Sequence, residues 1–113
     1  MRPARTCWAI LAGMWVIGGS VSAVGATPAS KVYVVTIENM QFTPQKLTVH
    51  VGDRVEWLNK DLVPHTATAD AKAFDSSSIA PNASWEFVAR HAGEYGYDCS
   101  FHPTMKATLT VVP

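Results

Sequence analysis

Residues 47–58 of the chain read LTVHVGDRVEWL, and this stretch decides the fold class. Apolar and polar residues alternate over 47–51, and they largely do so again over 54–58, after Gly52 and Asp53. Alternation with a period of two places one side of a β-strand against a core. A Gly-Asp pair is a turn signal. The stretch therefore predicts two β-strands joined by a turn.

The same pattern recurs along the chain on both sides of this stretch, with prolines and glycines between the alternating segments. Short strands at near-regular spacing, separated by turn signals, favour an all-β sandwich or barrel. Further strands are predicted over residues 31–38, 65–69, 84–88, 94–99 and 106–112. Residues 70–78 fit no strand, and we expect an irregular loop or one helical turn there.

The predicted core consists of the large apolar residues on one side of the alternating segments. Burying each of them stabilises a domain by about 1.5–3 kcal/mol before conformational entropy is counted. The set comprises Phe42, Leu47, Val49, Val55, Trp57, Phe87, Tyr95, Tyr97, Leu109 and Val111.

The first 26 residues have the layout of a secretory signal peptide. Two arginines and no acidic residue precede an apolar run, CWAILAGMWVIGG, and small residues follow it. The sequence therefore predicts a signal peptide over residues 1–26 and one domain over residues 27–113. Cleavage after Ala23 instead of Ala26 also fits the pattern. An uncleaved anchor is the alternative, although the run is short for a membrane span of about 20 residues.

Charge and cysteine content narrow the function of the predicted domain. Two of the nine basic residues and none of the nine acidic residues lie in the signal, so residues 27–113 carry a net charge of −2. This balance disfavours nucleic acid as a partner. We expect a monomer without a membrane span once the signal is removed. Cys99 is then the one cysteine of an exported domain, and metal binding accounts for an unpaired thiol there.

The segment Cys99–Met105 reads CSFHPTM and places a thiol, an imidazole and a thioether three residues apart. His65 follows Pro64 far upstream and completes a set of four donors. Two histidines, one cysteine and a weak methionine ligand are the donor set of blue copper electron-transfer sites. Structural zinc sites prefer four Cys or His ligands. The sequence therefore predicts one copper ion bound by His65, Cys99, His102 and Met105.

Three stretches of the chain together resemble the cupredoxins, the family of type I blue copper proteins. They are FTPQKLTVHVGDRVEW over 42–57, GEYGYDC over 93–99, and the C-x2-H-x2-M loop that follows. The resemblance implies an eight-stranded Greek-key sandwich and a periplasmic carrier of single electrons that is not an enzyme. It also implies that His65, Cys99 and His102 are equatorial ligands, with Met105 axial. In such proteins the second histidine, here His102, is the usual electron exit.

Two features depart from the family pattern. Thr66 stands where most relatives have an asparagine that steadies the cysteine loop, and its hydroxyl can still form a hydrogen bond. Phe101 and Thr104 also differ from the usual residues of the ligand loop. The resemblance implies redox protein partners, typically a dehydrogenase and a c-type cytochrome. These departures leave the identity of the partners open.

Two rival functions use the same residues. Cys99 and His102 would make a thiol nucleophile and its base, but the sequence shows no third orienting residue and that reading leaves Met105 unexplained. A copper chaperone or copper store is the alternative to an electron carrier. Such proteins usually expose Met-rich or Cys-x-x-Cys clusters, whereas residues 27–113 hold one cysteine and two methionines. We interpret His50 and His91 as surface residues.

Overall fold

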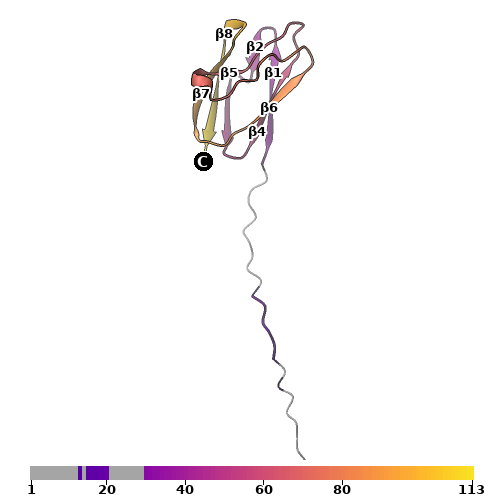
Figure 1. The fold of residues 1–113 in the computed structure, drawn as a ribbon, viewed down its shortest axis with the longest axis vertical. Coiled ribbons are helices and arrows are strands. Elements are labelled where there is room, and N and C mark those ends of the chain that lie inside the picture. The colour runs from indigo at the N-terminus through magenta and orange to yellow at the C-terminus, as the bar shows by residue number, and fades with distance from the viewer. Residues whose placement is uncertain (1–12, 14, 21–29) are drawn as a thin grey trace, which may run out of the picture.

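The computed structural model describes residues 13, 15–20 and 30–113, and the last of these ranges forms a two-layered β-sandwich (Figure 1). One four-stranded sheet, in the order β2-β1-β4-β6, consists of β1 (Val32–Glu38), β2 (Gln41–Thr43), β4 (Arg54–Asn59) and β6 (Ser84–Val88). The other, in the order β3-β8-β7-β5, consists of β3 (Lys46–His50), β5 (Thr68–Ala69), β7 (Gly93–Cys99) and β8 (His102–Val112). The predicted all-β Greek-key sandwich of about eight strands is confirmed.

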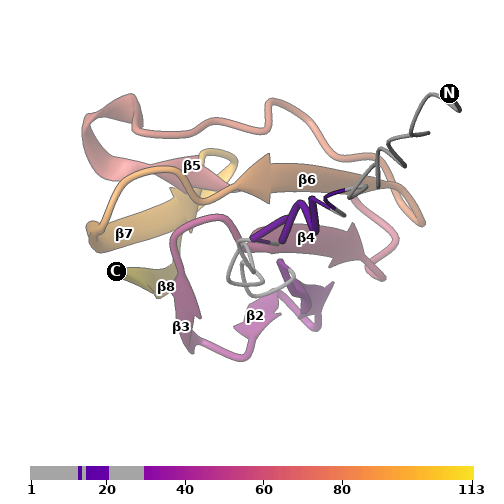
Figure 2. The ribbon, with the colours of Figure 1, turned by 90° about the horizontal axis from the view of Figure 1, so that it is seen from below.

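The turn at Gly52 and Asp53 carries the chain from one sheet to the other. Figure 2 shows β4 beside β6, away from the pair β7 and β8. Gly52 adopts a φ of 97°, which suits glycine, and its amide donates to the Ala89 carbonyl at 2.7 Å. The buried Asp53 carboxylate accepts the backbone amides of Lys31 and His50, each at 2.9 Å. These bonds fix the start of β4, which leads toward His65.

Aromatic side chains fill the space between the sheets around Trp57, which is fully buried. The rings of Phe74, Tyr97 and Trp85 lie 5.3, 5.5 and 5.7 Å from the Trp57 ring, centroid to centroid. Burial raises the pKa of Tyr97 to about 12. Of the ten predicted core residues, seven are buried and three are partly buried, namely Leu47, Phe87 and Tyr95.

Three local predictions need correction. The strand β2 was not expected, because three residues are too few to show alternation. The strand predicted over 65–69 is reduced to Thr68–Ala69, and His65 instead forms an isolated bridge with Ile79. The strand predicted over 106–112 begins earlier, at His102. The loop over 70–78 contains one 3-10 turn at Asp70–Lys72, as the sequence allowed.

The boundary between signal and domain stays a prediction. The predicted signal peptide over residues 1–26 lies largely outside the described residues. Within the part of the chain that the structure describes, no helix is long and apolar enough to cross a membrane.

Candidate metal centre

Three of the four predicted ligands come together from two parts of the chain. Cys99 ends β7 and His102 begins β8, and the two residues face each other in the antiparallel register of these strands. His65 lies in the loop before β5. Its amide donates to the Ile79 carbonyl at 3.2 Å, and the Ile79 amide donates back at 2.7 Å. Backbone pairing therefore fixes the positions of all three residues.

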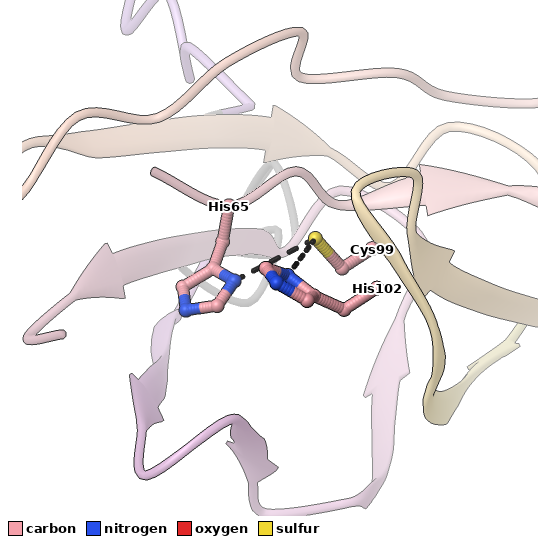
Figure 3. A group of neighbouring side chains, drawn as sticks. All are labelled: His65, Cys99 and His102. Carbon is pink, nitrogen blue, oxygen red and sulfur yellow. Dashed lines mark hydrogen bonds between the residues drawn. The ribbon is translucent and has the colours of Figure 1, made fainter. Parts of the chain in front are cut away.

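The donor atoms of these residues face one point (Figure 3). The Cys99 Sγ lies 3.6 Å from the His65 Nδ1 and 3.9 Å from the His102 Nδ1. All three donor atoms lie within 4.8 Å of one another. Bonds of about 2.0 Å to nitrogen and about 2.3 Å to sulfur, about 120° apart, place the two donors about 3.7 Å apart. The two sulfur–nitrogen separations are therefore compatible with three donors to one metal ion.

Burial differs across the three donors. The side chains of His65 and Cys99 are fully buried, whereas His102 is half-buried. A soft thiolate with two imidazoles suits copper. A metal held here would be shielded by protein on the His65 side, with His102 between it and solvent.

The Cys99 sulfur, which the two imidazole nitrogens face, also accepts a hydrogen bond from a backbone amide. The Thr66 amide donates to Sγ at 3.3 Å, which stabilises a buried thiolate. The Thr66 hydroxyl accepts the Ser100 amide at 2.8 Å, so it ties the segment after His65 to the segment after Cys99. The expected hydrogen bond from this threonine is confirmed, in place of the family's asparagine.

Asp61 belongs to the site, although its sequence context did not mark it as a functional residue. Its Oδ2 lies 2.7 Å from the His65 Nε2, and its two oxygens also accept the amides of Asn39 and Met40 at 2.7 and 3.0 Å. Burial acts to raise the pKa of Asp61, but the Met40 amide, the His65 ring and the Asn39 amide outweigh it and hold that pKa below its usual value.

An ionised Asp61 decides which nitrogen of His65 carries the proton. A carboxylate can only accept, so the proton lies on Nε2, and Nδ1 keeps its lone pair toward Cys99. Such a partner also fixes the ring orientation of a metal-binding imidazole. The spacing of four residues between Asp61 and His65 was the available signal, but it carries little weight alone.

Asp61→Asn is expected to weaken copper binding about ten- to a hundredfold, because His65 loses the carboxylate that fixes its tautomer. Competition with a copper chelator of known affinity measures the change. Glu94→Gln removes an exposed carboxylate at the start of β7 and serves as the matched charge control. Equal affinities of the Asp61→Asn and unsubstituted proteins would contradict this role of Asp61.

Met105 stays a predicted ligand. It lies three residues after His102 in β8, and its side chain is 6% exposed. Its burial is compatible with an axial position, and it is equally compatible with core packing.

The fold and the donor set together define a β-sandwich metalloprotein with a nitrogen- and sulfur-rich centre. Residues 8–111 match the cupredoxin-like domain family. The chain therefore belongs to this family, whose cofactor is a single copper ion, as the sequence resemblance predicted.

Individual relatives agree with this assignment. Amicyanin from Paracoccus versutus is 28% identical, over 98% of this chain and 95% of the relative. Chloroplastic plastocyanin from Tetradesmus obliquus is 33% identical, over 80% of this chain and 70% of the relative. The solved structure of the Cu(I) form of an amicyanin variant is similar, with a TM-score of 0.68 at 27% identity, over 74% of this chain and 85% of that one.

Proposed function

We propose that this chain is an exported type I copper protein that carries single electrons between redox partners. The copper would be held by His65, Cys99, His102 and Met105. The observation that carries the proposal is the spacing of 3.6 and 3.9 Å between the Cys99 sulfur and the two imidazole nitrogens. The similarity to amicyanin and plastocyanin supports the role of electron carrier over that of enzyme.

Electron transfer at this site depends on how rigidly the side chains are held. Copper, when bound, supplies the Cu(II)/Cu(I) couple. His65 is fixed by the Ile79 bridge and by Asp61, and Cys99 by strand pairing and the Thr66 amide. A trigonal set of two nitrogens and one sulfur is acceptable to both oxidation states. Little then has to move when an electron arrives, which favours fast transfer.

The accessible side of the site is proposed as the electron exit. His102 is half-buried, and its neighbours Phe101 and Pro103 are exposed, with Phe101 52% exposed. Leu62 and Pro64, before His65, are exposed as well. An exposed apolar surface of this kind is typical of a docking site for another protein. The proposed partners are a dehydrogenase as donor and a c-type cytochrome as acceptor.

A nucleophilic role for Cys99 fits the structure poorly. The side chain of Cys99 is 0% exposed, so a substrate would have no direct access to the sulfur. This burial supports the proposal that the chain is a carrier and not an enzyme.

The proposed location is the periplasm, with residues 1–26 as the export signal and 27–113 as a monomeric domain. The apolar run followed by small residues supports export. The net charge of −2 over residues 27–113 supports protein partners and not nucleic acid.

Met105→Leu is expected to keep the copper and raise its reduction potential. A thioether is a weak donor, and its removal destabilises Cu(II) more than Cu(I). Cyclic voltammetry of the copper-loaded protein measures the shift, with Met40→Leu as the control for loss of a thioether outside the ligand loop. A potential that falls, or that shifts equally in both variants, would contradict an axial role for Met105.

Stopped-flow kinetics tests the carrier role against the copper-handling alternative. The proposal predicts that the reduced protein passes electrons rapidly to a c-type cytochrome. It also predicts that an excess of chelator removes the copper far more slowly than electrons are transferred. Rapid loss of copper to the chelator without reduction of the cytochrome would instead identify a chaperone or a store.

A further inference from the structure

A network of hydrogen bonds beside Cys99 links the oxygen-bearing side chains of Thr66, Thr68, Asp75 and Ser100. The Thr68 Oγ1 is its centre, at 2.9 Å from the Thr66 Oγ1, 3.1 Å from the Ser100 Oγ and 3.2 Å from the Asp75 Oδ1. At one end of this network Thr66 is 4% exposed, and at the other end Asp75 is exposed to solvent. The network thus runs from the surface to the residue whose amide contacts the Cys99 sulfur.

The backbone brings these residues together independently of their hydroxyls. Thr68 pairs with Asp98 of β7 on one side and bridges to Asp75 on the other. The Ser77 amide donates to the Asp75 Oδ1 at 2.9 Å and holds the carboxylate in place. Thr68 therefore lies between β7 and the loop that follows η1 (Asp70–Lys72).

The direction of every hydrogen bond in the network follows from Asp75. An ionised carboxylate only accepts, so Thr68 donates its single hydroxyl proton to Asp75. The Thr68 oxygen is then left to accept from the hydroxyls of Thr66 and Ser100. Thr66 donates its hydroxyl hydrogen to Thr68, which orients the hydroxyl so that its oxygen accepts the Ser100 amide at 2.8 Å.

We propose that Asp75 is a positioning residue for the metal centre, which acts through Thr68 to fix the Thr66 hydroxyl and the Ser100 amide. Ser100 directly follows Cys99, and Thr66 donates its own amide to the Cys99 sulfur. The network therefore holds both segments that position the thiolate. The effect of this network on bound copper rests on the proposed function. Its effect on the hydrogen bond of the Ser100 amide does not depend on that function.

Amide hydrogen exchange of Ser100, followed by NMR, tests this role. Thr68→Val removes the central hydroxyl with little change in volume, and Asp75→Ala removes the final acceptor. Each is expected to speed the exchange of the Ser100 amide about three- to tenfold, because one hydrogen bond that held it is weakened. Thr68→Ser keeps a hydroxyl at this position, so the Ser100 amide of this variant is expected to exchange at the rate of the unsubstituted protein. Glu94→Ala, the control for lost charge, is expected to do the same.

The double variant Thr68→Val with Asp75→Ala shows whether Asp75 acts through Thr68. If it does, the double variant exchanges no faster than Thr68→Val alone, since the two changes share one path. The proposal would be overturned if the increase in the Ser100 exchange rate of the double variant equalled the product of the two single increases. An unchanged rate in Asp75→Ala or in Thr68→Val would also overturn it.

The visible spectrum of the Cu(II) protein is the second measurement on the same variants. The thiolate–copper band is expected to shift in both single variants and to stay unchanged in Thr68→Ser and Glu94→Ala. A band that is unchanged throughout would overturn the link to the metal centre. If the proposed function is wrong, the unsubstituted protein itself lacks the thiolate–copper band. That outcome is therefore distinguishable from a band that is present and unchanged in the variants. The exchange rates in the metal-free protein would still decide the role of Asp75.

Discussion

Cys99→Ser is expected to abolish the reversible one-electron couple of the copper-loaded protein. The thiolate is the soft donor that supports Cu(I), and a serine hydroxyl is neutral at ordinary pH and a hard donor. The Cys99 sulfur is also the atom that both imidazole nitrogens face, at 3.6 and 3.9 Å. Cyclic voltammetry before and after the substitution measures the effect.

Met40→Leu is the control for this prediction, because it changes another sulfur-bearing side chain of residues 27–113, outside the ligand loop. It is expected to leave the couple unchanged. Circular dichroism of the Cys99→Ser protein verifies that the sandwich is still folded. A reversible wave retained by a folded Cys99→Ser protein would rule out this thiolate as a copper ligand.

Trp57→Ala is expected to lower the free energy of unfolding by about 3–5 kcal/mol, as removal of a buried tryptophan usually does. The side chain is 0% exposed and packs against Phe74, Tyr97 and Trp85. Small domains have about 5–15 kcal/mol of stability in total, so the loss is a large share of it. Tyr97 precedes Cys99 by two residues on β7, and the cavity therefore borders the strand that carries the thiolate.

Urea unfolding followed by far-ultraviolet circular dichroism measures this loss, and it is done with and without copper because bound metal adds stability. Trp85→Ala is the control, since Trp85 is only partly buried in β6 and is expected to cost less. If the two substitutions cost the same, or if Trp57→Ala costs less than about 1 kcal/mol, Trp57 is not the centre of the core.

The fold could be predicted well where alternation was long enough to read. The strands β3, β4 and β6 follow from segments with a clear period of two and a turn residue beside them. The short strand β2 could not be predicted in this way. Phe74 shows a different limit, because it is buried from a loop and its burial depends on the aromatic rings of both sheets.

The cluster of His65, Cys99 and His102 could be predicted because the chemistry of the candidate donor set is specific. A thiolate, two imidazoles and a thioether in this order suit few metals, and the structure brings three of them together. Among the residues that support the donors, the hydrogen bond of Thr66 could be predicted from the family pattern, whereas the role of Asp61 could not. Asp61 acts on His65 only because the turn at Asn39 and Met40 holds its carboxylate there. That contact depends on the packing of segments about 20 residues apart.

The visible absorption spectrum of the unsubstituted protein during titration with Cu(II) tests the central claim most directly. The account predicts an intense blue band that saturates at one equivalent of copper and is bleached by ascorbate, with the Cys99→Ser protein as the blank. A protein that stays colourless through the titration, or whose band is the same in the blank, would contradict a thiolate–copper centre formed by His65, Cys99 and His102.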